Sequence, residues 1–115
     1  MTEQHNNLSE FNEQETLERI KKQLSDNPVI LYMKGKPQSP QCGFSAAAVK
    51  ALAECGKPFA FVNILENANI RATMHKHSNW PTFPQLFINQ ELIGGSDIIA
   101  QMHESGELST ALNKI

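Results

Sequence analysis

The strongest constraint on the fold is a short apolar segment at residues 29–33, with the sequence Val-Ile-Leu-Tyr-Met. A strand without a polar position has to be covered on both faces, which places it in the middle of a sheet. The alanine-rich segment 45–55 predicts a helix, and the apolar run 59–64 predicts a second strand. Two strands joined through a helix run parallel by a right-handed crossover. Residues 29–64 therefore predict a βαβ unit.

An amphipathic helix is predicted ahead of this unit, over about residues 12–25. Its apolar residues recur at three- and four-residue steps, and Asn12 followed by Glu15 resembles a capping box at the helix start. Residues 1–11 are mostly polar and are expected to form a flexible N-terminus. We therefore expect a single folded domain over residues 12–115.

More elements are predicted after the βαβ unit. Residues 67–78 predict a helix. The apolar runs 85–88 and 91–95 predict two antiparallel strands joined by a tight turn at Asn89-Gln90. The second half of the sheet is therefore expected to be a hairpin.

The C-terminal region completes the predicted architecture. Ser96 as an N-cap and Asp97 in the first turn predict the start of a helix that Gly106 ends, and residues 108–115 predict a last short helix. The resulting fold class is α/β: a thioredoxin-like, four-stranded mixed sheet flanked by about five helices.

Charge and hydropathy argue against two classes of partner. The formal net charge of −2 gives no positive field that would attract nucleic acid or anionic lipid. No segment approaches the ~20 apolar residues of a membrane span, and the polar, acid-containing N-terminus is unlike a secretory signal or a transit peptide. We therefore expect a cytoplasmic protein that binds neither nucleic acid nor membrane.

Cys42 is the candidate reactive residue. It stands at the start of the alanine-rich helix, where unpaired backbone N–H groups favour thiolate over thiol. The alternative is a small buried hydrophobic residue, a frequent role for cysteine. Three residues later, where a dithiol oxidoreductase has its second cysteine, the chain has Ser45. Cys42 therefore has no local partner for a disulfide.

The second cysteine, Cys55, is predicted to serve packing. It lies on the last turn of the same helix, and a rise of ~1.5 Å per residue places it about 20 Å from Cys42. A disulfide tolerates less than about 7 Å between Cα atoms, so a bridge between the two is excluded within one chain.

Two further segments contain candidate binding groups. Pro84 is either the end of a loop or a cis proline that turns the Phe83 backbone toward the cysteine, open to pairing with an extended peptide. The segment Gly94-Gly95-Ser96-Asp97 is either a simple helix start or a site for the charged end of an amino acid, with backbone N–H groups for the carboxylate and Asp97 for the ammonium group.

Other polar and aromatic residues have less specific patterns. Lys34 and Arg71 are either solvated surface charges or, if they converge near Cys42, a second carboxylate site. The four histidines have no metal-ligand spacing and are expected at the surface. Trp80 and Phe44 are expected to pack or to lie at the rim of the site.

Three separated motifs, together with Lys34, resemble those of the monothiol glutaredoxins of the CGFS class, in their bacterial single-domain form. These motifs are Cys42-Gly43-Phe44-Ser45, Trp80-Pro81-Thr82-Phe83-Pro84-Gln85 and Gly94-Gly95-Ser96-Asp97. The resemblance extends from about Glu15 to Ile115. It implies a glutathione-dependent protein that binds a [2Fe–2S] cluster between two subunits, with Cys42 as the ligand. It also implies cluster transfer to iron–sulfur acceptor proteins and partnership with BolA-like proteins.

The same resemblance implies a glutathione site. The residues at matching positions are Lys34 and Arg71 for the glycine carboxylate, the Phe83 backbone for the cysteinyl unit, and Ser96 with Asp97 for the γ-glutamyl end. Many relatives have a cysteine in place of Ser96, so a regulatory disulfide at that position is not expected in this chain.

The number of available sulfurs supports the same interpretation independently. A typical [2Fe–2S] cluster has four thiolate ligands, and this chain offers one credible sulfur, Cys42. Two chains and two external thiols such as glutathione complete the set, which predicts a homodimer when the cluster is bound. Two other functions stay open: a glutathione-dependent monothiol oxidoreductase acting on glutathione–protein mixed disulfides, and an adaptor whose thiol is incidental.

Overall fold

A mixed β-sheet forms the centre of the protein. The computed structural model describes the backbone of residues 2–115 and the side chains from Glu13 onward. Four strands lie in the order β4-β1-β5-β6: β1 (Val29–Met33), β4 (Ala60–Asn63), β5 (Gln85–Ile88) and β6 (Glu91–Gly94). β1 pairs with β4 in parallel and with β5 antiparallel, and β5 pairs antiparallel with β6. The position of β1 inside the sheet confirms the prediction from its apolar sequence.

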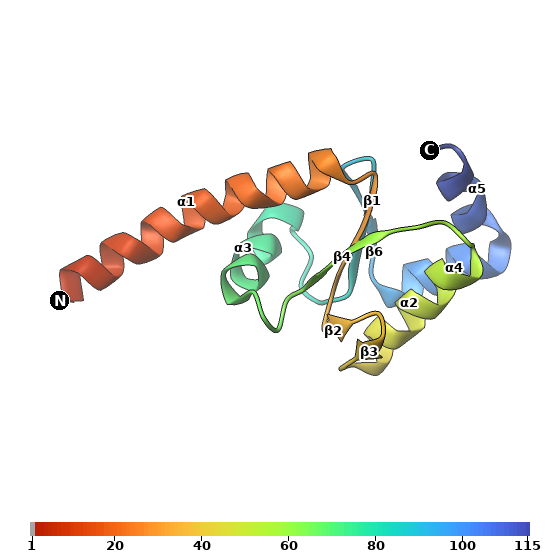
Figure 1. Cartoon of the computed structure of the whole chain (residues 1–115), viewed down its shortest axis with the longest axis horizontal. Helices are drawn as coiled ribbons and strands as arrows, with labels where there is room; N and C mark the ends of the chain where they lie inside the picture. Colours follow the sequence, from red (N-terminus) through yellow and green to blue (C-terminus); the bar gives the residue numbers. More distant parts are fainter. Residues whose placement is uncertain (1) are drawn as a thin grey trace.

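Helices cover both faces of this sheet (Figure 1). On one face lie α1 (Thr2–Asp26) and α3 (Ala68–Ser78). On the other face lie α2 (Gly43–Glu54), α4 (Ser96–Ser105) and α5 (Glu107–Asn113). This is the thioredoxin-like α/β arrangement that the order of elements predicts.

The alternation of side chains along β1 gives the protein two cores. Val29, Leu31 and Met33 pack on the side of α2, α4 and α5. Ile30 and Tyr32 point to the opposite side, toward α1 and α3. All five are buried, which explains why this strand contains no charged or exposed polar side chain.

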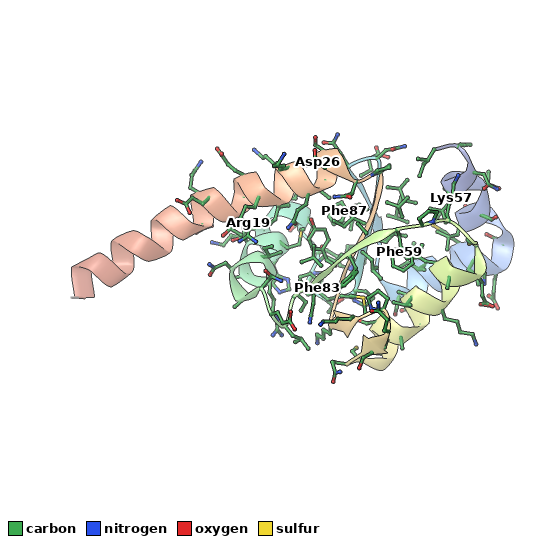
Figure 2. All side chains as sticks on the ribbon, viewed as in Figure 1. Arg19, Asp26, Lys57, Phe59, Phe83 and Phe87 are labelled. Atoms are coloured by element: carbon green, nitrogen blue, oxygen red, sulfur yellow. The ribbon has the colours of Figure 1, made fainter. Side chains whose placement is uncertain are left out.

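The N-terminal helix is longer than predicted. It begins at Thr2, so Asn12 lies within α1 and does not cap it. Its C-terminal half packs on the sheet through Ile20 and Leu24, both buried in the same core as Phe87, which Figure 2 labels beneath the helix. The side chains of residues 2–12 lie outside the described part, so the flexibility expected of residues 1–11 stays a prediction.

The segment between β1 and α2 contains a small hairpin. Its strands are β2 (Gly35–Lys36) and β3 (Ser39–Pro40). Gly35 has a φ of +95°, and a Cβ there would lie 2.7 Å from the backbone nitrogen of Gln41. Only glycine fits this close approach. The turn between β5 and β6 is the predicted two-residue connection, with left-handed φ at both of its residues.

Asn63 connects the hairpin to the sheet, and we predict that its loss is destabilising. Its Oδ1 accepts hydrogen bonds from the backbone N–H groups of Gly35 (2.9 Å) and Leu65 (3.0 Å), and the residue is 8% exposed. Asn63→Ala leaves these donors unpaired and is expected to lower the free energy of unfolding by about 1–3 kcal/mol, measured by urea denaturation. Asn69→Ala, at an exposed position of α3, is the control and should change stability by less than about 0.5 kcal/mol.

Candidate functional site

A pocket of about 330 Å³ opens where the end of β1, the start of α2, the segment before β5 and the start of α4 meet. Five of the six residues predicted for the ligand and cluster site line it: Lys34, Cys42, Phe83, Ser96 and Asp97. They come from four separate segments of the chain. The fold therefore brings together most of the predicted site.

Cys42 is the N-cap residue of α2, with extended backbone angles (φ −153°, ψ 135°), and it is half-buried in the pocket wall. The backbone N–H of Ser45 lowers the pKa of the Cys42 thiol, assisted by the N–H of Phe44 and the charge of Lys34, while desolvation acts in the opposite direction. These N–H groups belong to the first turn of the helix, where the backbone has no partner of its own. The helix start therefore favours the nucleophilic and metal-binding form of the sulfur.

Ser45 has a structural role that was not predicted. It is fully buried, and its hydroxyl accepts a hydrogen bond of 3.1 Å from the backbone N–H of Lys34. This bond ties the end of β1 to the first turn of α2. A signal was present in the sequence, because Ser45 shares the helix face of buried Ala48 and Leu52.

The segment before β5 forms the wall opposite the helix. The Phe83–Pro84 peptide bond is cis, and both residues line the pocket. The Phe83 ring is itself buried in the core between the sheet and α3, where Figure 2 labels it. The backbone of Phe83 is therefore the part of this residue that a ligand can reach.

The start of α4 differs from the prediction in its capping residue. Gly95 is the N-cap, and Ser96 is the first helical residue, so the assignment of Ser96 as the cap was wrong. A Cβ at Gly95 would lie 3.2 Å from the Trp80 indole nitrogen and 3.4 Å from the Pro84 carbonyl oxygen. The close approach of these groups leaves little room for a side chain at the capping position. Ser96 and exposed Asp97 both face the pocket.

Comparison with known proteins identifies the family. The profile described as "Glutaredoxin" matches residues 29–93. The chain is 54% identical to Glutaredoxin 4 of Escherichia coli (strain K12) over 99 residues, which is 86% of each chain. This chain belongs to the glutaredoxin family.

Among solved structures, it is similar to reduced apo GrxS14 of poplar, with a TM-score of 0.73, 44% identity and coverage of 84% of this chain and 88% of that one. It also has the fold of a buckwheat glutaredoxin in complex with glutathione, with a TM-score of 0.80, 21% identity and coverage of 91% and 94%.

One predicted residue of the glutaredoxin site stands apart from the others. Arg71 is exposed in the first turn of α3 and does not line the pocket. Its role toward a ligand carboxylate stays a prediction. Lys34 is half-buried in the pocket wall, and its charge lowers the pKa of Cys42.

The second cysteine of this glutaredoxin packs as predicted. Cys55 is the C-cap of α2, at the opposite end of the helix from Cys42, and it contacts the core on that face. Burial and the neighbouring Glu54 carboxylate raise the pKa of the Cys55 thiol. Both cysteines are free. The thiol with the lowered pKa is therefore the one in the pocket.

Two of the histidines predicted at the surface are only partly exposed. His103 is half-buried, with Nδ1 3.9 Å from the Cys55 sulfur and Nε2 3.3 Å from a Glu54 carboxylate oxygen. His75 is also half-buried, with Nδ1 3.1 Å from the Trp80 carbonyl oxygen. His77 is exposed as predicted, and the side chain of His5 lies outside the described residues.

The described residues contain neither a grouped set of metal ligands nor a membrane-spanning helix. No group of three or more His, Cys, Asp or Glu side chains among them is arranged to hold a metal ion. None of the helices in this part of the chain combines the length and the apolar character that crossing a bilayer requires.

We predict that Lys34→Met slows the reaction of Cys42 with an alkylating agent. Removing the positive charge removes part of the stabilisation of the thiolate, so the pKa of Cys42 rises and less thiolate is present near neutral pH. The rate is expected to fall by a factor of about 2–5, the range of a partly exposed charge interaction. The measurement is the rate of iodoacetamide alkylation as a function of pH, in a Cys55→Ser background so that Cys42 is the single thiol observed.

Lys36→Met, at an exposed position nearby, is the control and should leave this pH profile unchanged. An equal shift of the profile in both variants would contradict a specific effect of Lys34.

Proposed function

We propose that this glutaredoxin binds a [2Fe–2S] cluster between two subunits and transfers it to iron–sulfur acceptor proteins. One observation carries the proposal: the pocket holds a single half-exposed sulfur, Cys42, with a lowered pKa and no second cysteine within reach. The neighbouring position where a second thiol would close a disulfide is Ser45, which is buried and hydrogen-bonded to the backbone. The sulfur is therefore available to a ligand from outside the chain.

The chemistry of the donor supports an iron–sulfur cluster. Thiolate is the ligand that such clusters require, and a typical [2Fe–2S] cluster has four. Cys42 supplies one, while Cys55 lies at the far end of α2, about 20 Å away. Two protein chains and two glutathione thiolates complete the set. When bound, the cluster would be the cargo of the protein, and Cys42 would hold it.

The pocket also suits glutathione, a tripeptide with two carboxylates and one ammonium group. Lys34, in the pocket wall, would bind its glycine carboxylate together with Arg71, which lies outside the pocket lining, and the Phe83 backbone would pair with its cysteinyl unit. The start of α4 would bind the γ-glutamyl end, with Ser96 near the carboxylate and Asp97 near the ammonium group. The fold shared with a buckwheat glutaredoxin–glutathione complex is consistent with this assignment.

The surface around Cys42 favours contact with other proteins. Phe44 follows the cysteine in the first turn of α2 and is 65% exposed, the most exposed large apolar side chain among the described residues. An exposed aromatic ring beside a shared ligand suits burial against a second subunit or an acceptor protein. We propose a homodimer in the loaded form, BolA-like and acceptor proteins as further partners, and action in the cytoplasm.

Reconstitution tests the proposal. Anaerobic incubation of the full chain with iron, sulfide and reduced glutathione is expected to give visible cluster absorption and a dimer in size-exclusion chromatography. Cys42→Ser is expected to abolish both without loss of the fold, because serine is a favourable N-cap residue. Cys55→Ser is the matched control and should load normally. A folded, reduced wild-type protein that takes up no cluster would refute the proposal.

A second candidate function is favoured by the lowered pKa of Cys42, which also suits a nucleophile. In this reaction the Cys42 thiolate attacks the glutathione sulfur of a mixed disulfide, and the protein thiolate leaves. A second glutathione thiolate then attacks the Cys42–glutathione disulfide, which releases oxidised glutathione and restores the thiolate. Rapid turnover of glutathionylated substrate by a protein that binds no cluster would favour this oxidoreductase over the carrier.

A further inference from the structure

Gln85, the first residue of β5, has a fully buried side chain. Its Nε2 donates to the carbonyl oxygens of Thr82 (3.0 Å) and Trp80 (3.3 Å). Its Oε1 is the buried side-chain oxygen without a hydrogen-bond partner in the described part of the chain. A buried, unpaired acceptor is destabilising, and an apolar side chain would avoid it. The amide is therefore suited to holding the segment before β5 rather than to packing.

A second side chain holds the same carbonyl group. His75 Nδ1 lies 3.1 Å from the Trp80 oxygen and, because a carbonyl only accepts, this nitrogen carries the proton. The His75 ring also packs edge-on against Phe83, with ring centroids 5.1 Å apart. The backbone of Trp80 is thus fixed from α3 by His75 and from β5 by Gln85.

This anchoring determines where the Trp80 side chain lies. The indole lines the pocket, and its nitrogen is so close to Gly95 that a Cβ there would be 3.2 Å away. Within the described residues, the indole N–H has no hydrogen-bond acceptor. Ser96 and Asp97, the residues at the start of α4, follow directly. The pocket therefore presents an unpaired donor beside the place where a carboxylate would bind.

We propose that Trp80 is a ligand-binding residue of this pocket and that Gln85 is its positioning residue. The indole N–H donates a hydrogen bond to the carboxylate bound at the start of α4, and the two amide hydrogen bonds of Gln85 keep the indole in place. The proposal rests on the proposed function in one respect, the identity of the ligand as glutathione. It gives a hydrogen-bonding role to Trp80, which was expected from the sequence to pack or to lie at the rim of the site.

Trp80 is the single tryptophan of the chain, so one indole resonance reports on it without interference. The experiment titrates the apo full-length protein with reduced glutathione under anaerobic conditions and follows ¹H–¹⁵N spectra. In the wild type, the indole N–H resonance is expected to move downfield as glutathione binds. Trp80→Phe keeps an aromatic ring but removes the donor, and its affinity is expected to fall about tenfold, equal to about 1.4 kcal/mol.

Gln85→Met separates positioning from stability. Methionine has nearly the same length and removes both donors together with the unpaired oxygen, so the midpoint of urea unfolding should change little. The affinity for glutathione is nevertheless expected to fall several-fold, and the indole resonance should move in the free protein. In the Trp80→Phe background, the same change should cost little further affinity, because the donor is already absent.

Gln23→Met is the matched control. Gln23 accepts a hydrogen bond from Tyr32 (2.8 Å) and lies outside the pocket, so its substitution should leave the affinity for glutathione unchanged.

The outcomes distinguish this inference from the function on which it rests. A wild type that does not bind glutathione overturns the proposed ligand and the assignment of Trp80 with it. A wild type that binds, with unchanged affinity in Trp80→Phe, overturns the inference alone. Equal losses from Gln85→Met in the presence and absence of the Trp80 indole would show that Gln85 does not act through Trp80. If Gln85→Met does not fold, the Trp80→Phe titration still decides whether the indole binds the ligand.

Discussion

The hydrogen bond from the Lys34 backbone N–H to the Ser45 hydroxyl is the contact on which the site depends. It joins the end of the central strand to the first turn of α2, and Ser45 is fully buried, so water does not compete for it. The side chains of β1 are buried in the two cores on both faces of the sheet, which fixes the position of the strand end. Cys42, the N-cap of α2, is therefore held close to the C-terminal end of β1.

The same helix start gives the sulfur its chemical character. Backbone N–H groups of the first turn and the charge of Lys34 outweigh desolvation and lower the pKa of Cys42. At the other end of α2, burial and Glu54 raise the pKa of Cys55. One helix thus carries a thiol with a lowered pKa at its start and a thiol with a raised pKa at its end. A reactive sulfur without an internal partner suits both cluster binding and the exchange of glutathione.

The remaining walls of the pocket come from elements that meet only in the folded chain. The segment before β5 is held by His75 from α3 and by Gln85 from β5. Gly95 caps α4 at the point where Trp80 and the Pro84 carbonyl come close. The unpaired oxygen of Gln85 shows that this arrangement is kept in spite of a destabilising buried group. Such compromises are common where geometry serves a ligand.

The order of the main elements, the central place of β1, the hairpin turn and the reactive position of Cys42 could be predicted from the sequence, because these follow from local periodicity, turn residues and the start of a helix. Lys34, Phe83, Ser96 and Asp97 were open candidates from the residues alone, the resemblance to a family assigned them to one glutathione site, and the fold brings them into one pocket. The small hairpin after β1, the capping of α4 by Gly95, and the contacts of Ser45, His75 and Gln85 became visible only in the folded chain. Each of these depends on atoms that folding brings close together, and no local pattern encodes such an approach.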